Sequence, residues 1–224
     1  MRLLAIGVTP WDIIAYCGGT LALCAAAGDE VTIAPLAGHR RGRGYAGAAQ
    51  AAADAVGARL DYAGTTSLQD CRAARDELMD IIREANPDVM VSSSPNARSA
   101  GERAAAELIF NAAYGACVPN YPSPSGRDAV AVRAPILHMD SVALTDEDGL
   151  SFVDIGEAWP RKDDALGAFG SPDGDLPEEA RHARWRGEVL SRARGVQVQT
   201  AWAEAFGQAQ VWGRLTTRRL LPGK

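Results

Sequence analysis

Two acidic residues, Asp12 and Glu102, stand where the chain could carry out chemistry. Asp12 comes shortly after the apolar run near the N-terminus, and Glu102 comes shortly after another run that ends at Ser92. A carboxyl group can bind a cation, or it can act as a general acid or base when a dry pocket raises its pKa. Both residues also have a structural alternative, because Asp is common in turns and at N-caps and Glu is favourable in the first turn of a helix.

A histidine and an aspartate form a second candidate pair in the segment Leu137-His138-Met139-Asp140-Ser141. Alternate residues of a strand point to the same face, so His138 and Asp140 could act together as an acid–base unit. The alternative for His138 is a hydrogen bond within the sheet. Of the three histidines, His138 is the best candidate for a base, because His39 falls in a predicted loop and His182 on a polar helix.

A basic, glycine-rich loop follows the second apolar run and reads His39-Arg40-Arg41-Gly42-Arg43-Gly44-Tyr45-Ala46-Gly47. Arg40, Arg41 and Arg43 lie near the start of a predicted helix and could bind a phosphate or a carboxylate. The loop also contains a GxGxxG string. That match to a dinucleotide fingerprint is weak, because a basic segment separates the first glycine from the strand. We expect at least two of these arginines to be solvated.

Short apolar runs alternate with longer helical patterns along the chain, which predicts parallel strands joined by crossover helices. The expected fold is α/β, with a Rossmann-like, doubly wound and mostly parallel sheet flanked by helices. The predicted strands are residues 3–7, 30–35, 59–62, 88–92 and 136–139. The predicted helices are residues 18–27, 45–56, 67–84 and 99–114.

The second half of the chain is richer in Pro and Gly and has fewer regular patterns. Helices are expected over residues 156–169 and 178–193. We expect a single domain over residues 1–224, with a regular α/β half at 1–115. Residues 116–224 are then expected to complete the sheet and form an irregular C-terminal cap.

Composition narrows the class of protein. The 224 residues include 23 Lys plus Arg and 28 Asp plus Glu, so the formal net charge is −5. An acidic protein is not expected to bind nucleic acid over its whole surface. No apolar run approaches the ~20 residues that span a bilayer, and the first run is too short for an export signal. The four cysteines show no CxxC pair. We expect a cytoplasmic protein with a small-molecule ligand and no nucleic-acid or membrane partner, and a homo-oligomer stays open.

The chain resembles the PIG-L or LmbE-like family, whose members are mostly zinc-dependent deacetylases of N-acetylglucosamine conjugates and related amides. The resemblance extends over nearly the whole chain. It rests on Val8-Thr9-Pro10-Trp11-Asp12 after the first strand, Asn86-Pro87-Asp88-Val89-Met90-Val91, Ser99-Ala100-Gly101-Glu102-Arg103-Ala104-Ala105, Val153-Asp154-Ile155 with Lys162 and Ala165-Leu166, and Arg194-Gly195 with Trp202-Ala203-Glu204-Ala205-Phe206.

The resemblance implies a zinc-binding pocket, from which this chain departs at most positions. The metal-binding histidine before the proline falls on Thr9, and the general-base aspartate falls on Trp11. Only Asp12 keeps the position of a metal-binding residue. The two histidines of the second cluster fall on Ser99 and Glu102.

Two further family positions have also changed, with Gly101 in place of an aspartate and Phe169 in place of a histidine. A catalytic zinc normally has three N, O or S protein ligands and a nearby base. The oxygen-rich set left here suits Mg, Ca or Mn better than zinc, so Asp12 and Glu102 would be the ligands if a metal binds. We assign no cofactor and expect ordinary zinc-dependent deacetylation to be lost.

Two hypotheses of function follow. In the first, the protein is an enzyme of this family with a remodelled site for another small substrate, anionic or sugar-derived. In the second, it is a non-catalytic homologue that binds a ligand or a protein partner in the former active-site cleft. The coincidence of Asp12 and Glu102 at two former ligand positions favours the enzyme.

The candidate residues divide by role. The catalytic candidates are Asp12, Glu102, His138 and Asp140. Trp11 and Phe169 are expected to make the pocket smaller, drier and more aromatic. The full set of substrate-binding candidates is Thr9, Trp11, Arg40, Arg41, Arg43, Asn96, Ser99 and Phe169.

Overall fold

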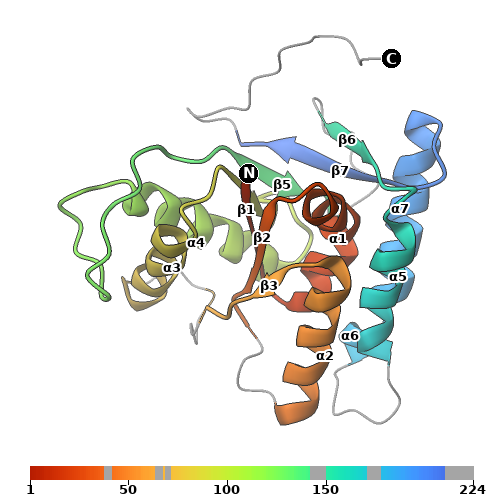
Figure 1. The fold of residues 1–224 in the computed structure, drawn as a ribbon, viewed down its shortest axis with the longest axis horizontal. Helices are drawn as coiled ribbons and strands as arrows, with labels where there is room; N and C mark the ends of the chain where they lie inside the picture. The colour runs from red at the N-terminus through yellow and green to blue at the C-terminus, as the bar shows by residue number, and fades with distance from the viewer. Residues whose placement is uncertain (38–41, 64–67, 69–71, 142–149, 171–177, 210–224) are drawn as a thin grey trace.

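The computed structural model describes residues 1–37, 42–63, 68, 72–141, 150–170 and 178–209, and within them seven strands form one sheet in the order β3-β2-β1-β4-β5-β7-β6 (Figure 1). Strands β1 to β5 run parallel, and β7 is antiparallel to both β5 and β6. The expected doubly wound, mostly parallel sheet is therefore confirmed. The strands are β1 (Arg2–Gly7), β2 (Glu30–Pro35), β3 (Arg59–Leu60), β4 (Val89–Ser92), β5 (Ile136–Met139), β6 (Ser151–Asp154) and β7 (Ala203–Gln208).

Helices cover both faces of the sheet, which gives three layers (Figure 1). One face is packed against α1 (Pro10–Ala26), α2 (Gly42–Val56), α5 (Trp159–Gly167) and α7 (Ala183–Val198), and the other against α3 (Arg72–Ala85) and α4 (Ala100–Ala116). A 3-10 turn (Ala168–Gly170) and the short α6 (Glu178–Arg181) lie between α5 and α7 in sequence.

Strand β1, which lies between β2 and β4, supplies side chains to both cores. Leu3 and Ala5 belong to the core under α1 and α2, and Leu4 and Ile6 belong to the core under α3 and α4. A strand with helices on both faces reads as a continuous apolar run, which is why its position was predictable from sequence. Burying each of the larger side chains stabilises the fold by roughly 1.5–3 kcal/mol relative to exposing it.

Helix α1 begins eight residues earlier than expected, at Pro10 and not at Gly18. Thr9 is its N-cap, and its side chain accepts a hydrogen bond from the backbone N–H of Asp12. Proline suits the first turn, where a missing N–H costs nothing. Gly18 and Gly19 therefore lie inside the helix. A Cβ at Gly19 would lie 2.7–2.9 Å from three atoms of Ile155, so close packing requires the glycine there.

The C-terminal half departs most from the expected elements. Strands β6 and β7 were not predicted, and the single helix expected over 178–193 is divided at His182 into α6 and α7. Half-exposed β6 has no apolar run, and β7 is built largely of Ala, Gly, Glu and Gln, which have low strand propensity. Strand β7 pairs between β5 and β6, so both halves of the chain share one sheet.

Candidate functional site

A cavity of about 360 Å³ lies where the strand order reverses. From β1 the chain passes to β2 on one side, and β4 lies on the other, so the loops after β1 and β4 diverge. Ligands of open α/β sheets bind in this crevice at the carboxyl ends of the strands. The cavity is lined by Val8, Thr9, Trp11, Asp12, Tyr16, Arg98, Ser99, Glu102, Ser141, Glu179 and Arg186.

Thr9 and Asp12 hold each other in the first turn of α1. The Thr9 hydroxyl donates to Oδ2 of Asp12 at 2.5 Å, while the backbone N–H of Asp12 donates to Oγ1 of Thr9 at 3.2 Å. The helix terminus thus fixes the direction of the Asp12 side chain. The candidates Thr9 and Asp12 face the cavity as one unit.

Arg186 brings a positive charge to Asp12 from the other end of the chain. Its Nη2 lies 3.2 Å from Oδ1 of Asp12 and also donates to the backbone carbonyl of Glu179 at 3.2 Å. The Asp12 side chain is largely buried. Both carboxylate oxygens of Asp12 consequently have a hydrogen-bond donor from this chain.

Glu102 lies in the first turn of α4 and is 8% exposed. The side chain of the N-cap Ser99 accepts from the backbone N–H of Glu102 at 3.5 Å. The Ser141 hydroxyl donates to Oε2 of Glu102 at 3.2 Å, and the Tyr16 hydroxyl also hydrogen-bonds to this carboxyl group. The side-chain donors to Glu102 are therefore neutral hydroxyl groups, whereas one of the two side-chain donors to Asp12 is a cation.

Burial and mutual repulsion perturb the carboxyl groups of the cavity. Burial raises the pKa of Asp12, and the hydrogen bond from Thr9 and the charge of Arg186 oppose that rise. Burial also raises the pKa of Glu102, and the charge of Asp12 raises it further. The pKa of Tyr16 is raised by burial and by both carboxylates. A carboxyl group that keeps its proton above the usual pH range can serve as a general acid.

These residues do not fit a catalytic zinc centre. Among the described parts of the chain, no group of three or more His, Cys, Asp or Glu side chains is arranged to hold a metal ion. Asp12, at the one retained ligand position, already accepts from Thr9 and from the guanidinium of Arg186. A cation brought to Asp12 would meet that guanidinium.

The candidates His138 and Asp140 are not among the residues that line the cavity. Nδ1 of His138 lies 2.9 Å from the Ser92 hydroxyl and 3.1 Å from the carbonyl of Ser93, so the ring is hydrogen-bonded beside the sheet. Oδ2 of Asp140 accepts from Nε of Arg194 at 2.7 Å in a buried ion pair. Each of the two side chains thus has a hydrogen-bond partner elsewhere in the chain.

The aromatic candidates Trp11 and Phe169 pack edge to face, with ring centroids 6.2 Å apart. Trp11 lines the cavity and is 5% exposed, whereas Phe169 lies behind it in the core and is not part of the lining. Tyr45 packs edge to face on Trp11 at 5.5 Å. The lining combines the aromatic rings of Trp11 and Tyr16 with mainly polar side chains.

The remaining candidates are Asn96 and three arginines near the start of α2. Asn96 is exposed in the loop after β4, where its backbone N–H donates to Oγ of Ser94, and it is not in the lining. Arg43 lies in the first turn of α2. Arg40 and Arg41 lie outside the described residues.

Six residues of the lining were not predicted from sequence, and three of them hydrogen-bond to Asp12 or Glu102. Tyr16 lies four residues after Asp12 on α1, so an earlier helix start would have placed both on one face. Ser141 directly follows Asp140 and gave no signal of its own. Arg186 comes from α7, 174 residues from Asp12, and only the tertiary structure brings the two together.

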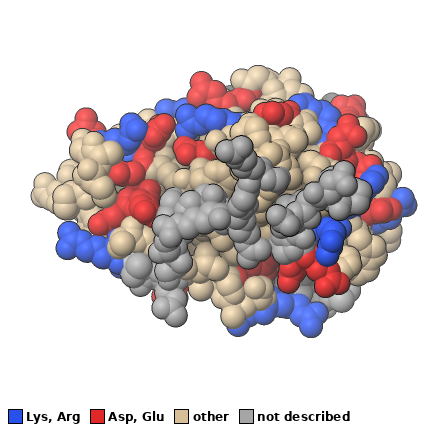
Figure 2. Space-filling view, turned by 90° about the horizontal axis from the view of Figure 1, so that it is seen from below, with Lys and Arg blue, Asp and Glu red and all other residues tan. Residues whose placement is uncertain are grey.

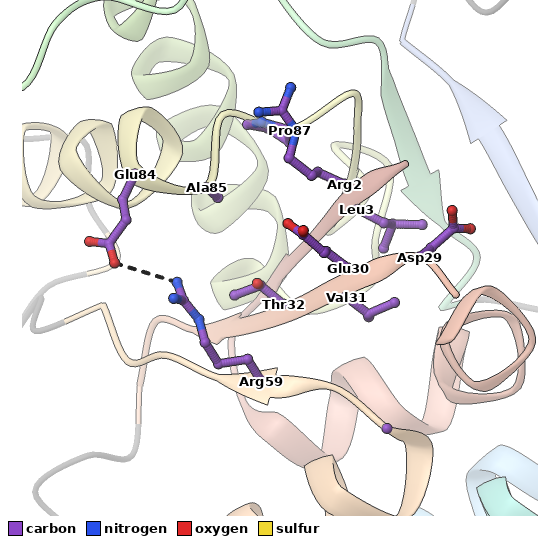
Figure 3. A pocket seen from close by; sticks show the side chains of 11 residues that line it. Arg2, Leu3, Asp29, Glu30, Val31, Thr32, Arg59, Glu84, Ala85 and Pro87 are labelled. Atoms are coloured by element: carbon purple, nitrogen blue, oxygen red, sulfur yellow. Dashed lines mark ion pairs between the residues drawn. The ribbon is translucent and has the colours of Figure 1, made fainter. Parts of the chain in front are cut away.

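A second hollow, of about 400 Å³, lies at the amino-terminal edge of the sheet (Figure 3). Four of its charged side chains, those of Arg2, Asp29, Arg59 and Glu84, have partners on this chain. Nη2 of Arg59 lies 3.6 Å from Oε1 of Glu84, and Oδ1 of Asp29 lies 2.8 Å from the amino group of Met1. Because ligands of such sheets bind at the carboxyl edge, we do not assign a function to this hollow.

The chain surface carries both signs of charge. Seen from below Figure 1, acidic and basic side chains are interspersed among the described residues (Figure 2). No described helix is long and apolar enough to cross a membrane. Specific binding at the cavity must then come from its local groups and not from a broad field.

Comparison with known proteins identifies the fold but not the family. No protein-family model matches the chain, and no curated protein sequence matches it. Solved structures do match over nearly the whole chain, at identities of 20% or less for the three named next.

GalB, the 4-carboxy-2-hydroxymuconate hydratase from Pseudomonas putida, matches with a TM-score of 0.75 and 20% identity, over 98% of this chain and 100% of that one. A conserved protein from Thermus thermophilus matches with a TM-score of 0.76 and 20% identity, over 97% and 98%. The N,N'-diacetylchitobiose deacetylase from Pyrococcus horikoshii matches with a TM-score of 0.72 and 17% identity, over 92% and 83%. The same fold thus occurs in a hydratase and in a deacetylase. The function of this chain therefore has to be inferred from the residues of its site and not from its fold.

Proposed function

We propose that the chain is a PIG-L or LmbE-like protein that performs acid–base chemistry on a small anionic or sugar-derived substrate, without ordinary zinc-dependent deacetylation. The observation that carries the proposal is the contact between Arg186 and Asp12 in a cavity that also holds Glu102. Its location in this proposal is the cytoplasm, where thiols such as the free Cys17, Cys24 and Cys117 stay reduced.

The two carboxyl groups have different roles in this proposal. Asp12 has a guanidinium and a hydroxyl as donors, and both favour the ionised form and oppose the rise in pKa that burial causes. Burial and the repulsion of Asp12 raise the pKa of Glu102 against the opposing effect of its hydroxyl donors, so Glu102 keeps its proton above the usual pH range of a carboxyl group. Glu102 is the general acid, and Asp12 is the base that receives a proton or orients a water molecule.

Arg186 supplies the charge compensation in this site. A guanidinium keeps its charge over the whole physiological pH range and can stabilise negative charge that develops on a substrate oxygen. Proton transfer of this type serves both the addition of water to a double bond and the hydrolysis of an activated bond. The presence of a hydratase and of deacetylases among proteins of this fold agrees with either reaction.

The test uses the wild type, Glu102→Gln, Asp12→Asn and the control Glu107→Gln, which changes an exposed residue of the same helix α4. Each variant is assayed with N-acetylglucosamine conjugates and with small unsaturated carboxylates, in the presence of a chelator. We expect turnover of an unsaturated carboxylate or another small substrate to survive the chelator. It should fall about 100-fold or more in Glu102→Gln and Asp12→Asn but not in Glu107→Gln.

Two other outcomes would contradict the proposed function. Deacetylation that requires added zinc would show that the ordinary mechanism is retained. Ligand binding without turnover of any substrate would favour the non-catalytic homologue. That alternative has one observation in its favour, since both oxygens of Asp12 already have donors within the chain.

A further inference from the structure

A third hollow, of about 590 Å³, adjoins the cavity on the side of the C-terminal cap. It is lined by Glu179, His182, Trp185 and Arg186. Glu179 and Arg186 also line the cavity that contains Asp12 and Glu102. The Arg186 side chain therefore stands at the boundary between an inner cavity and an outer hollow.

The outer hollow has a largely apolar wall. Trp185 is 64% exposed, although Trp is usually buried to a large extent. A large exposed aromatic ring beside a polar cavity is typical of a surface that binds a ligand, because stacking on the ring removes apolar area from water. A flat apolar ring of a ligand would fit this wall against the Trp185 indole.

Arg186 has hydrogen-bonding capacity that the chain does not use. A guanidinium carries five N–H groups, and Nη2 makes both of the contacts described above. Nε is buried and has no hydrogen-bond partner among the described residues. The side chain as a whole is 29% exposed, so a ligand would approach the N–H groups of the guanidinium beyond the buried Nε. A planar fork of this kind is matched by the two oxygens of a carboxylate.

We propose that the inner cavity and the outer hollow form one binding site for a carboxylate that carries a flat apolar ring. The ring stacks on Trp185, the carboxylate accepts hydrogen bonds from Arg186, and the reacting part of the molecule extends toward Glu102. Arg98, on the inner side, adds a second positive charge to the site. This inference rests on the proposed function only for the direction in which the reacting part points.

The test measures the binding of three probes by calorimetry. Cinnamate has both the ring and the carboxylate, cinnamamide removes the charge, and acrylate removes the ring. We expect cinnamate to bind the wild type about fivefold or more tightly than either of the other two. Equal affinity for cinnamate and cinnamamide would overturn the role of the carboxylate, and equal affinity for cinnamate and acrylate would overturn the role of the ring.

Variants assign each contact. We expect Arg186→Gln to remove the preference for cinnamate over cinnamamide, and Trp185→Ala to remove the preference over acrylate. Arg184→Gln is the matched control, because Arg184 is an exposed arginine of the same helix that pairs with Asp163. Wild-type preferences in both test variants would overturn the inference, provided that their circular dichroism shows a folded protein. Arg186→Lys adds a folded variant that keeps the charge, and it should bind cinnamate more weakly than the wild type.

Binding and turnover separate the two proposals. Loss of turnover in Glu102→Gln with unchanged cinnamate binding would support both of them. Cinnamate binding that does not depend on Trp185 or Arg186 would end the present inference and leave the acid–base proposal standing. Turnover that does not depend on Glu102 would end the acid–base proposal and leave the present inference standing.

Discussion

Nη2 of Arg186 lies 3.2 Å from Oδ1 of Asp12 and joins the last helix of the chain to the first turn of the first helix. Asp12 is also held by Thr9, which is the N-cap of that first helix. The contact therefore has two consequences. It connects the C-terminal cap to the carboxyl end of β1, and it compensates the charge of the largely buried Asp12 carboxylate.

Replacing Arg186 by glutamine should destabilise the protein by about 1–3 kcal/mol, because Asp12 would remain largely buried without its cation. Adding Asp12→Asn to that variant should restore part of the loss. Urea unfolding at neutral pH gives both values. Arg184→Gln breaks an exposed ion pair on the same helix and should cost less than about 1 kcal/mol. Equal costs for the two arginines would contradict this explanation of the contact.

The raised pKa of Glu102 makes the stability of the protein depend on pH. The folded protein binds this proton more tightly than the unfolded chain does, so the stabilisation is fully present below the ordinary value of 4.5. It is lost as the pH rises through the raised value. Glu102→Gln cannot ionise, so its free energy of unfolding relative to the wild type should increase between about pH 4 and pH 7. The difference for the exposed Glu107→Gln should stay nearly constant, and a constant difference for Glu102→Gln would refute the shift.

Lys162 and Glu204 form an ion pair in the interior, with Nζ 2.7 Å from Oε1 and both side chains at most 2% exposed. Glu204 also accepts from the backbone N–H groups of Gly19 and Thr20, and Lys162 donates to Ser191. Lys162→Met should cost about 3–5 kcal/mol, because it leaves a buried carboxylate unpaired. The double variant Lys162→Met with Glu204→Gln should cost less than the sum of the single changes in urea unfolding. Additive losses would show that the two groups are not coupled.

Two glycines inside helices should respond in opposite ways to alanine. Gly19→Ala places a Cβ within 2.9 Å of the Ile155 side chain and should destabilise the protein by about 1–3 kcal/mol. Gly47 lies in α2 with open space around its Cβ position, so Gly47→Ala should stabilise by about 0.5–1 kcal/mol through its better helix propensity. Thermal unfolding compares the two. A stabilised Gly19→Ala would show that α1 and Ile155 do not pack as described.

Buried strands were the part of the fold most accessible from sequence. The predicted bounds of β2 and β5 coincide with those of the structure, because each is a short apolar run between turn residues. The start of α1 was missed, because the expected helix began at the two glycines Gly18 and Gly19. In the structure they lie in the helix interior, where the close approach of Ile155 requires a glycine at position 19. Strands β6 and β7 were missed because their pairing with each other and with β5 is a tertiary feature.

The site was accessible from sequence only where it follows the strands. Thr9, Trp11 and Asp12 follow β1, and Ser99 and Glu102 follow β4, so the topology of the sheet brings them to one cavity. Arg186 was inaccessible, because nothing in the local sequence of α7 indicates which residue faces a helix 174 positions away. The same limit applies to His138, for which strand alternation could not show that the ring is hydrogen-bonded to Ser92 and Ser93.

Calorimetric titration of the purified protein with zinc at neutral pH tests the central claim most directly. Because Arg186 already compensates Asp12 and the donor set is poor in imidazole, we expect no stoichiometric zinc binding that depends on Asp12. The Asp12→Asn variant, titrated in parallel, distinguishes this cavity from any other zinc-binding group on the chain. One tightly bound zinc ion per wild-type chain that disappears in Asp12→Asn would contradict the claim that Arg186, and not a metal ion, provides the positive charge of this site.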